Sequence, residues 1–410
     1  MKQTLLMKRF AVATVAVIMS TMLFFSCERQ PILHLHEGTP WDINLPIIDL
    51  NLKVYWNYGI NYRVDYDLDY DWEDEWYYGW DDTDRELFGE IGYEEPASFC
   101  LRRYYTAKVP YAPHTEVQRH TFSGKSFTAK YSWGYWDLLA WNDITTIDGI
   151  QSLIFDEETT LDSVIAYTNQ TMHSSRYQAP KYTRSFYQPE QLFAGYDQAE
   201  EINRDLIGFV WDEERQAYVK DIDLTLEPAT YIYLTQVIIH HNRGRITGCD
   251  GNGNLSGMAR SVNLNTGVSG TDPITVHYSV RYKTGCKKLD ESVDIIGGRL
   301  LSFGMCGVNP NRIPKTQKSY DDGMRHYLDV DMQFNNGYDS TFVFDVTDQV
   351  RQRYKGGVIT VELDADNIDI PSRTGGSGFD AVVEDYDEET HEFDIGDGSK
   401  AKARRRSSRK

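Results

Sequence analysis

Residues 65–82, DYDLDYDWEDEWYYGWDD, concentrate more chemically capable side chains than any other stretch of this chain. The segment holds nine acidic and seven aromatic residues in eighteen positions, without Lys or Arg. From 65 to 72 every second residue is Asp, so an extended backbone would carry an acidic edge and an aromatic face. Carboxylates could bind a cation, and aromatic rings could stack on a flat ligand or pack on the protein itself.

The cation hypothesis starts from carboxylates at i, i+2 and i+4, which is the spacing of a calcium loop. An EF-hand loop also needs Gly at its sixth position and Glu at its twelfth. Counted from Asp65, these positions hold Tyr70 and Trp76, so the EF-hand motif is absent. A loose, weak calcium site stays a hypothesis, and the sequence assigns no metal ligand.

The aromatic residues support a second hypothesis, because Trp and Tyr stack on sugar faces and anchor protein interfaces. The candidate ligand or partner surface consists of Trp72, Trp76, Tyr77, Tyr78 and Trp80. The alternative is a long β-hairpin insertion whose aromatic face packs on its own domain while its acidic residues face solvent. The stretch alone does not decide between them.

Catalysis and cofactor binding are not expected. His240 and His241 are adjacent, so in a strand they point to opposite faces and cannot line one site. The sequence contains no GxSxG, HExxH, P-loop or dinucleotide-binding motif. No catalytic residue is therefore assigned.

The N-terminus predicts export. Lys2, Lys8 and Arg9 precede an apolar run at 10–25, which is the pattern of a secretory signal peptide. The run stops at Ser26-Cys27 and resembles bacterial signals that are cut before a cysteine whose sulfur is then diacylated. That resemblance implies that Cys27 is the lipidated N-terminus, and several acyl chains anchor a protein stably to a membrane.

The charge distribution excludes nucleic acid as a partner. The chain carries a formal charge of −20; residues 1–26 contribute +3 and the last eleven residues +7, so residues 27–399 carry −30. Binding to phosphate backbones requires a basic surface. The basic end, KAKARRRSSRK, is expected to be disordered.

Four further cysteines stand at positions 100, 249, 286 and 306, and an exported protein can form disulfides. Three of them lie in the C-terminal half. The expectation is one bond between two of Cys249, Cys286 and Cys306, with the pairing open.

Alternation of apolar and polar residues predicts strands at 47–56, 274–282, 327–334, 342–346 and 358–364. Such strands, separated by turn clusters, indicate an all-β chain built from antiparallel sandwiches. Short helices are expected at 155–168 and 345–357, and a polar connector at 196–206. The predicted segments are a signal peptide (1–26), a tether (27–45), an N-terminal sandwich (46–205), a C-terminal sandwich (206–395) and a basic tail (396–410).

Four segments carry a family resemblance: ATYIYLTQVIIHH (229–241), NLSGMARSVNLNTG (254–267), FDVTDQV (344–350) and GGSGFDAVVEDYDEE (375–389). In order and spacing they resemble the DUF5119 family of exported Bacteroidales lipoproteins, which is related to fimbrillin and fimbrial anchor proteins. The resemblance implies two transthyretin-like β-sandwich domains, an acyl anchor and a role in or beside surface fimbriae. It implies no catalytic residues.

The sequence therefore predicts a non-enzymatic lipoprotein of the outer membrane, exposed at the cell surface. Its expected work is that of an accessory, anchor or tip component of a fimbria-like structure or adhesin, with fimbrial subunits as partners that bind by strand addition. The alternative is a surface glycan-binding lipoprotein that uses the aromatic residues named above. A third interpretation places the protein on the periplasmic side of the membrane.

Overall fold

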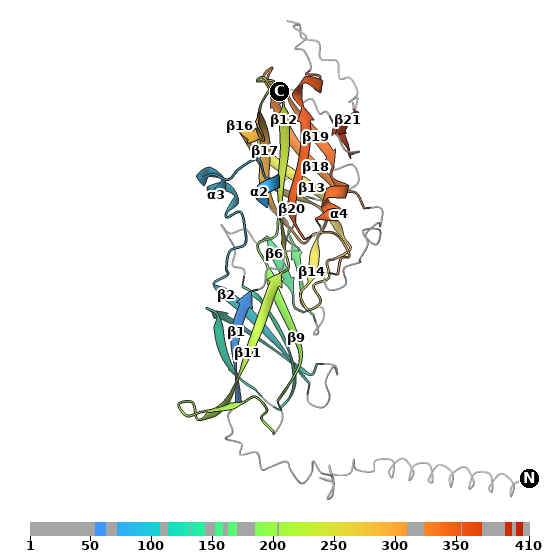
Figure 1. Ribbon diagram of the computed structural model, residues 1–410. Coiled ribbons are helices and arrows are strands. Elements are labelled where there is room, and N and C mark those ends of the chain that lie inside the picture. The colour runs from blue at the N-terminus through green and yellow to red at the C-terminus, as the bar shows by residue number, and fades with distance from the viewer. Residues whose placement is uncertain are drawn as a thin grey trace, which may run out of the picture. The chain divides into compact units, whose positions relative to one another are not determined.

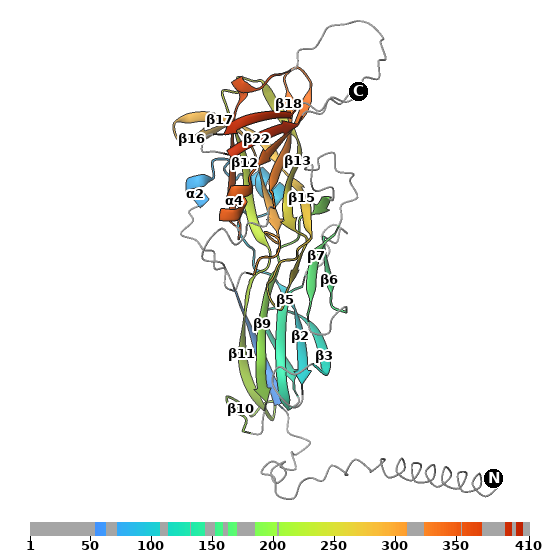
Figure 2. The same ribbon diagram turned by 90° about the vertical axis from the view of Figure 1, so that its right-hand side faces the viewer.

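The structure is a computed structural model that describes residues 54–62, 72–106, 114–131, 133–143, 152–158, 163–169, 185–202, 205–309, 324–353, 355–370, 390–395 and 399–404. The predicted signal peptide, Cys27, the tether and residues 65–71 lie outside the described residues. Strands make up most of the described chain, which confirms the predicted all-β class (Figures 1 and 2). Within those ranges, no helix has the length and apolar character needed to cross a membrane.

Residue contacts divide the chain into two units. The smaller unit comprises Met1–Val54 and Trp211–Tyr218, and in its described part the rings of Trp211 and Tyr218 meet edge to face at 5.0 Å between centroids. The larger unit comprises Tyr55–Val210 and Val219–Lys410. All sites discussed below belong to the larger unit.

One sandwich packs a four-stranded sheet on a seven-stranded sheet. The four-stranded sheet has the order β16 (Arg281–Lys288), β17 (Glu291–Ser302), β12 (Tyr231–His240), β20 (Gly357–Asp364). The seven-stranded sheet has the order β21 (Thr390–Ile395), β22 (Ser399–Arg404), β19 (Asp339–Asp345), β18 (Tyr327–Phe334), β13 (Ile246–Ala259), β15 (Pro273–Ser279), β8 (Ser185–Tyr187). Inward-facing residues of both sheets, such as Val237, Leu255 and Phe344, form one buried core between them.

A second core lies between two further sheets. The larger sheet has the order β3 (Glu116–Ser123), β2 (Ser98–Thr106), β5 (Gly134–Asn142), β9 (Phe193–Ile202), β11 (Ala217–Pro228), β1 (Val54–Tyr62), β4 (Ser126–Lys130), and β10 (Val210–Asp212) pairs with β11. The smaller sheet has the order β14 (Ser261–Asn263), β7 (Ile165–Thr168), β6 (Leu153–Asp156). Tyr104, Leu139 and Trp141 of the larger sheet pack with Ala166 and Val262 of the smaller one.

Helices are few and short in the described chain: α2 (Trp72–Glu75), α3 (Asp82–Phe88), α4 (Thr347–Gln352) and a 3₁₀ turn at Ala365–Asn367. Helix α4 confirms part of the helix expected at 345–357. Its N-cap is Val346, which makes no side-chain cap hydrogen bond.

Four predicted strands are confirmed, since β15, β18, β19 and β20 coincide with the alternating segments after residue 273. The helix expected at 155–168 is wrong, because its two ends form β6 and β7. The polar connector expected at 196–206 is also wrong over most of its length. Its residues up to Ile202 belong to β9, whose neighbours in the sheet are β5 and β11.

The pairing of strands does not support a boundary between the two sandwiches near residue 205. That position falls between β9 and β11, which pair with each other in one sheet. The chain also passes between the two sandwiches more than once, because β8 belongs to the seven-stranded sheet and β14 to the smaller sheet of the other sandwich, so no single position divides them. The expected disordered tail also differs from the structure, because Ser399–Arg404 forms strand β22 beside β19.

Candidate functional site

The segment Asp74–Tyr93, called the strap below, lies on the outer face of the four-stranded sheet. Tyr78 packs with Ile238, Val293 and Ile295 of that sheet. Farther along the sheet, Ile91 and Tyr93 of the strap pack on a second apolar cluster that includes Leu234 and Val358. Four aromatic residues of the 65–82 stretch, Trp76, Tyr77, Tyr78 and Trp80, are therefore packed on the C-terminal half of the protein.

The predicted ligand surface is only partly accessible. Tyr78 is 2 % exposed, so it belongs to the core and not to a ligand surface. Trp76, Tyr77 and Trp80 are half-buried, and Trp76 contacts the rings of both Tyr78 and Trp80. Trp72 begins α2, and its side chain lies outside the described part of the structure. The expected hairpin does not form over 72–88, where the chain makes α2, a turn and α3.

Local sequence explains this turn and helix. Gly79 adopts φ +76°, a conformation that favours glycine, and its carbonyl accepts a hydrogen bond from Trp76 Nε1 at 3.0 Å. Asp81 then caps α3: its Oδ1 accepts from the backbone N–H of Asp84, and Asp84 Oδ2 accepts from the N–H of Asp81. This reciprocal pair is a capping box built from two aspartates.

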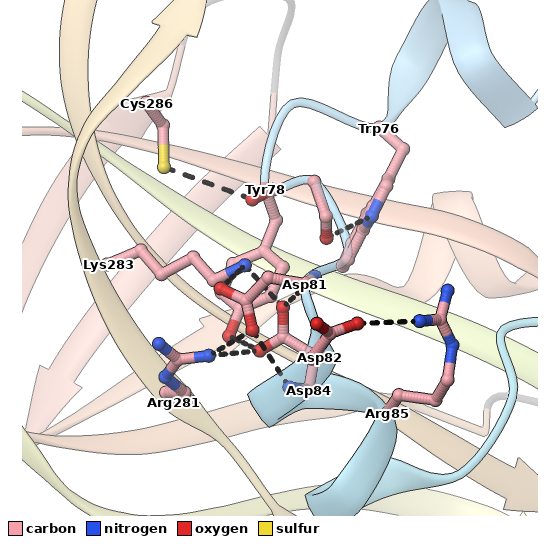
Figure 3. Close-up of polar contacts among 10 residues, drawn as sticks. Trp76, Tyr78, Asp81, Asp82, Asp84, Arg85, Arg281, Lys283 and Cys286 are labelled. Atoms are coloured by element: carbon pink, nitrogen blue, oxygen red, sulfur yellow. Dashed lines mark hydrogen bonds and ion pairs between the residues drawn. The ribbon is translucent and has the colours of Figure 1, made fainter.

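A charge cluster around the buried Asp84 fixes the strap to β16 (Figure 3). The carboxylate of Asp84 is fully buried and accepts hydrogen bonds at 2.8 Å from Tyr78 Oη and from Arg281 Nη1. Lys283 also pairs with Asp84, and its ammonium lies 4.2 Å from the centre of the Tyr78 ring. Asp81 pairs with both cations, at 2.8 Å to Arg281 and 3.1 Å to Lys283.

These contacts perturb two groups in the cluster. The hydrogen bond from Arg281 lowers the pKa of Asp81 well below its usual range. Burial raises the pKa of Tyr78 far above its usual value, and its hydrogen bond to Asp84 adds to that effect. Asp81 is therefore an anion and Tyr78 a neutral phenol at neutral pH, which suits a structural clamp.

A second set of contacts fixes the start of the strap over β12 and β20 (Figure 1). Gln236, in the middle of β12, accepts from the backbone N–H of Tyr77 at 3.0 Å and donates to the carbonyl of Glu75 at 2.5 Å. Arg353 pairs with the Glu75 carboxylate. Gly297 of β17 has no side chain where Tyr78 packs; a Cβ there would stand 2.5 Å from Tyr78 Cδ2.

The strap ends beside a cleft with a volume of about 260 Å³. Its walls come from five places in the chain: Tyr93 of the strap, β9 around Tyr196, β11 at Thr225 and Glu227, β12 at Tyr231, and the turn that follows β14. Lys355, just before β20, completes the lining. Sequence reasoning missed this cleft, because its residues are far apart in the chain and form no local motif.

The adjacent histidines lie at the ends of the parallel strands β12 and β20. His240 lies between Glu291 and Glu362, with contacts at 3.1 and 3.3 Å, whereas His241 contacts Asp364 at 3.2 Å. The two rings thus have different partners, but strand alternation is not the cause, because His241 lies beyond β12 with φ +50°.

His241, Asp364 and Asp366 also bring their potential ligand atoms within 4.8 Å of one another. Arg243 and Arg245 each lie 3.5 Å from the carboxylate of Asp366 and already supply positive charge there. The group is therefore a paired surface cluster, and we assign no metal to it.

The cysteines do not behave as expected. Cys100, Cys249, Cys286 and Cys306 are all free, so the predicted bond among the last three is wrong. Burial raises the pKa of the Cys100 thiol to about 11, which disfavours the reactive thiolate.

No family model matches this sequence, and no curated protein matches it either. Among solved structures, one from Bacteroides ovatus described as a "putative adhesin" shares 13 % identity at a TM-score of 0.44, over 80 % of this chain and 97 % of that one. The fimbrial anchor protein Mfa2 from Porphyromonas gingivalis shares 10 % identity at a TM-score of 0.34, over 76 % and 90 %. Both TM-scores lie below 0.5, so the function proposed next is derived from the sequence and geometry of this chain.

Proposed function

We propose that this chain is a non-enzymatic lipoprotein of the bacterial outer membrane, held at the cell surface by acyl chains on Cys27. Its work would be that of an accessory, anchor or tip component of a fimbria-like structure or adhesin. The lipoprotein-like signal and the resemblance to fimbrillin-related lipoproteins support this placement. The physical mechanism would be strand addition, in which a sheet edge accepts an extended segment of a partner subunit.

The observation that carries this proposal is the edge of β19 in the seven-stranded sheet. Strand β22 pairs antiparallel with β19 over four residue pairs, from Thr341 with Arg404 to Phe344 with Ala401. The edge of β19 can therefore hold an added strand, and here a distant segment of the same chain supplies it. Backbone hydrogen bonds provide affinity in such a pairing, and alternate side chains provide selectivity.

The register also indicates that β22 is a weak occupant. Phe342 and Phe344 are buried in the sandwich core, and their partners across the strand pair are Ala403 and Ala401. A partner strand with Val at both positions would place four more carbon atoms opposite these two rings, and burying four such carbons is worth about 3 kcal/mol at about 0.8 kcal/mol each. That difference corresponds to about a hundredfold in affinity.

The alternative of glycan binding by the 65–82 stretch loses support from this structure. Tyr78, one of its five candidate residues, is buried, and Trp76, Tyr77 and Trp80 pack on the sheet below.

Strand addition can be tested with a chain that lacks Thr390–Lys410 and fluorescent peptides of Ser399–Arg404. We expect the peptide with Ala401→Val and Ala403→Val to bind about a hundredfold more tightly than the native sequence. The matched control carries Lys400→Val and Lys402→Val, which places the same residues on the opposite face, and should gain little. Equal affinity of all three peptides would exclude β19 as a selective strand acceptor.

Surface exposure needs a separate test. Protease treatment of intact cells, with mass spectrometry of the released peptides, should release peptides of this protein from wild-type cells. In a Cys27→Ala variant the protein should leave the cells. Full protection of the wild type would place the protein on the periplasmic side and overturn the proposed role.

A further inference from the structure

We infer that the cleft beside the end of the strap binds a neutral saccharide of one or two pyranose rings. This inference goes beyond the proposed assembly function and uses different residues. It also differs from the glycan-binding alternative, because none of the aromatic residues in 72–80 lines the cleft.

Two cleft tyrosines are held in fixed positions by their hydroxyl groups. Tyr93 Oη donates to the carbonyl of Thr230 at 2.6 Å, and its ring meets Phe193 edge to face at 5.4 Å. Tyr196 Oη donates to Asp137 Oδ2 at 3.0 Å, and its ring meets Tyr104 edge to face at 6.4 Å. Since both hydroxyls already have partners in the protein, these residues offer the cleft rigid apolar ring surface, which is what the C–H faces of a sugar contact.

The polar part of the lining complements those rings. Asn263 uses its Oδ1 to accept from two backbone N–H groups of its turn, while its Nδ2 has no partner in the described chain. Lys355 Nζ and the exposed Thr225 hydroxyl likewise have no hydrogen bond or ion pair to the described residues. The cleft therefore offers hydrogen-bond donors and a hydroxyl beside aromatic rings, as binding sites for polyhydroxylated ligands require.

Charge and size narrow the class of ligand. The lining contains one anion, Glu227, and one cation, Lys355, so the cleft has no net charge of its own. Residues 27–399 carry −30, which repels anionic sugars from the whole protein. The volume of about 260 Å³ is slightly smaller than the pockets of about 300 Å³ and more that hold drug-sized ligands, and it suits one ring with part of a second.

Two strands that line this cleft approach each other closely. A Cβ on Gly195 of β9 would stand 2.4 Å from the carbonyl oxygen of Thr225 on β11, so glycine is needed there. Thr225 itself is exposed, and a larger side chain at its position would enter the cleft without displacing core residues.

Saturation-transfer difference NMR on the full chain tests the inference. The probes are maltose, lactose and N,N′-diacetylchitobiose as neutral sugars, with glucuronate as the anionic comparator. The chain is kept in a detergent without a sugar headgroup. We expect signals from at least one neutral disaccharide and none from glucuronate.

Three variants locate the binding. Thr225→Trp should fill the cleft and weaken binding at least tenfold, and Lys355→Ala should weaken it a few-fold. Tyr338→Ala changes a half-buried tyrosine in the turn between β18 and β19, outside the cleft, and should bind as wild type does. All three should keep the wild-type unfolding midpoint and the peptide affinity at β19.

Three results would overturn the inference: no signal from any neutral probe, a stronger signal from glucuronate, or unchanged binding in both Thr225→Trp and Lys355→Ala. If Thr225→Trp fails to fold, Lys355→Ala together with Asn263→Ala decides the outcome. Because β19 lies outside the cleft lining, loss of sugar binding leaves the strand-addition result untouched, and the two proposals can fail separately.

Discussion

Substitution of Asp84 measures how strongly the strap is held. The carboxylate accepts from Tyr78, from Arg281, from the backbone of Asp81 and from Lys283, and it is fully buried. Removing one partner of a buried ion pair costs about 3–5 kcal/mol. Asp84→Ala leaves Arg281 and Lys283 paired with Asp81, which limits the loss of stability. It also leaves the buried Tyr78 hydroxyl without its acceptor, which costs about 1–3 kcal/mol. We therefore expect Asp84→Ala to lower the free energy of unfolding by about 4 kcal/mol.

Urea unfolding of the full chain, followed by tryptophan fluorescence, measures this loss. With a slope of about 3 kcal/mol per molar urea, a loss of about 4 kcal/mol shifts the midpoint by about 1.3 M. The matched control is Asp82→Ala, an aspartate two positions away whose side chain is 99 % exposed and, among the described residues, pairs only with Arg85 in a surface bridge. That control should stay within about 0.5 kcal/mol of wild type.

A double-mutant cycle with Tyr78→Phe separates the hydrogen bond from the charge pairs. In the wild-type background, loss of the hydroxyl should cost about 1 kcal/mol, because its partner Asp84 stays paired with the two cations. In the Asp84→Ala background the same change should be neutral or stabilising, since it removes an unsatisfied hydroxyl. If Asp84→Ala and Asp82→Ala shift the midpoint equally, the strap is not packed on the sheet and the solvent-facing hairpin would be the better description.

Four further predictions concern single groups. Gly297→Ala should cost about 1–3 kcal/mol in urea unfolding, because the added Cβ collides with the ring of Tyr78. The pKa of Asp81 is lowered in the folded state, so its contribution to stability is present above about pH 4 and is lost as the pH falls further; Asp81→Asn should flatten the acid limb of a pH–stability curve. Burial raises the pKa of Asp329 well above its usual value, so stability falls as the pH rises past about 4, and the stability gained by Asp329→Asn should grow as the pH rises above that point. Cys100, with its pKa raised to about 11, should react with iodoacetamide at pH 8 slowly in the native protein and rapidly in urea, without any reductant.

Strand positions could be predicted from the sequence where one face of a strand is buried and the other is polar. In β18, for example, Leu328, Val330 and Met332 are core residues and alternate with acidic ones. The prediction failed for 155–168, where the run Val164–Thr168 is too short to separate strand from helix. Residues Ile165–Thr168 form a strand because they pair with Ser261–Asn263, almost a hundred residues away. The local sequence contains no pattern from which that partner could be predicted.

The polar segment around β9 failed for a related reason. Glu200 and Glu201 indicate solvent exposure, and a solvated strand face is as polar as a connector. Pairing of β9 with β5 and β11 on its two sides makes it a strand all the same. Glu201 is exposed, whereas Glu200 is half-buried and Ile202 buried, so charge in the sequence indicated the solvated face of this segment but not its backbone.

The strap shows how two sequence signals must be joined to predict a packed surface. In β12, residues 232–239 are buried on both faces of the sheet, and their sequence IYLTQVII lacks the alternation of a half-exposed strand. Both faces of such a strand must pack on other parts of the protein. The opposite sheet packs on one face, so another segment must pack on the outer face. The aromatic residues at 76–80 require an apolar surface, and Asp81 and Asp84 require cations. Arg281 and Lys283 alternate with Tyr282 on β16, so they lie on the same outer face. The outer face of the four-stranded sheet thus offers apolar surface and two cations, and the segment 76–84 offers aromatic rings and two carboxylates. This complementarity favours packing of the segment on the sheet over a free ligand surface.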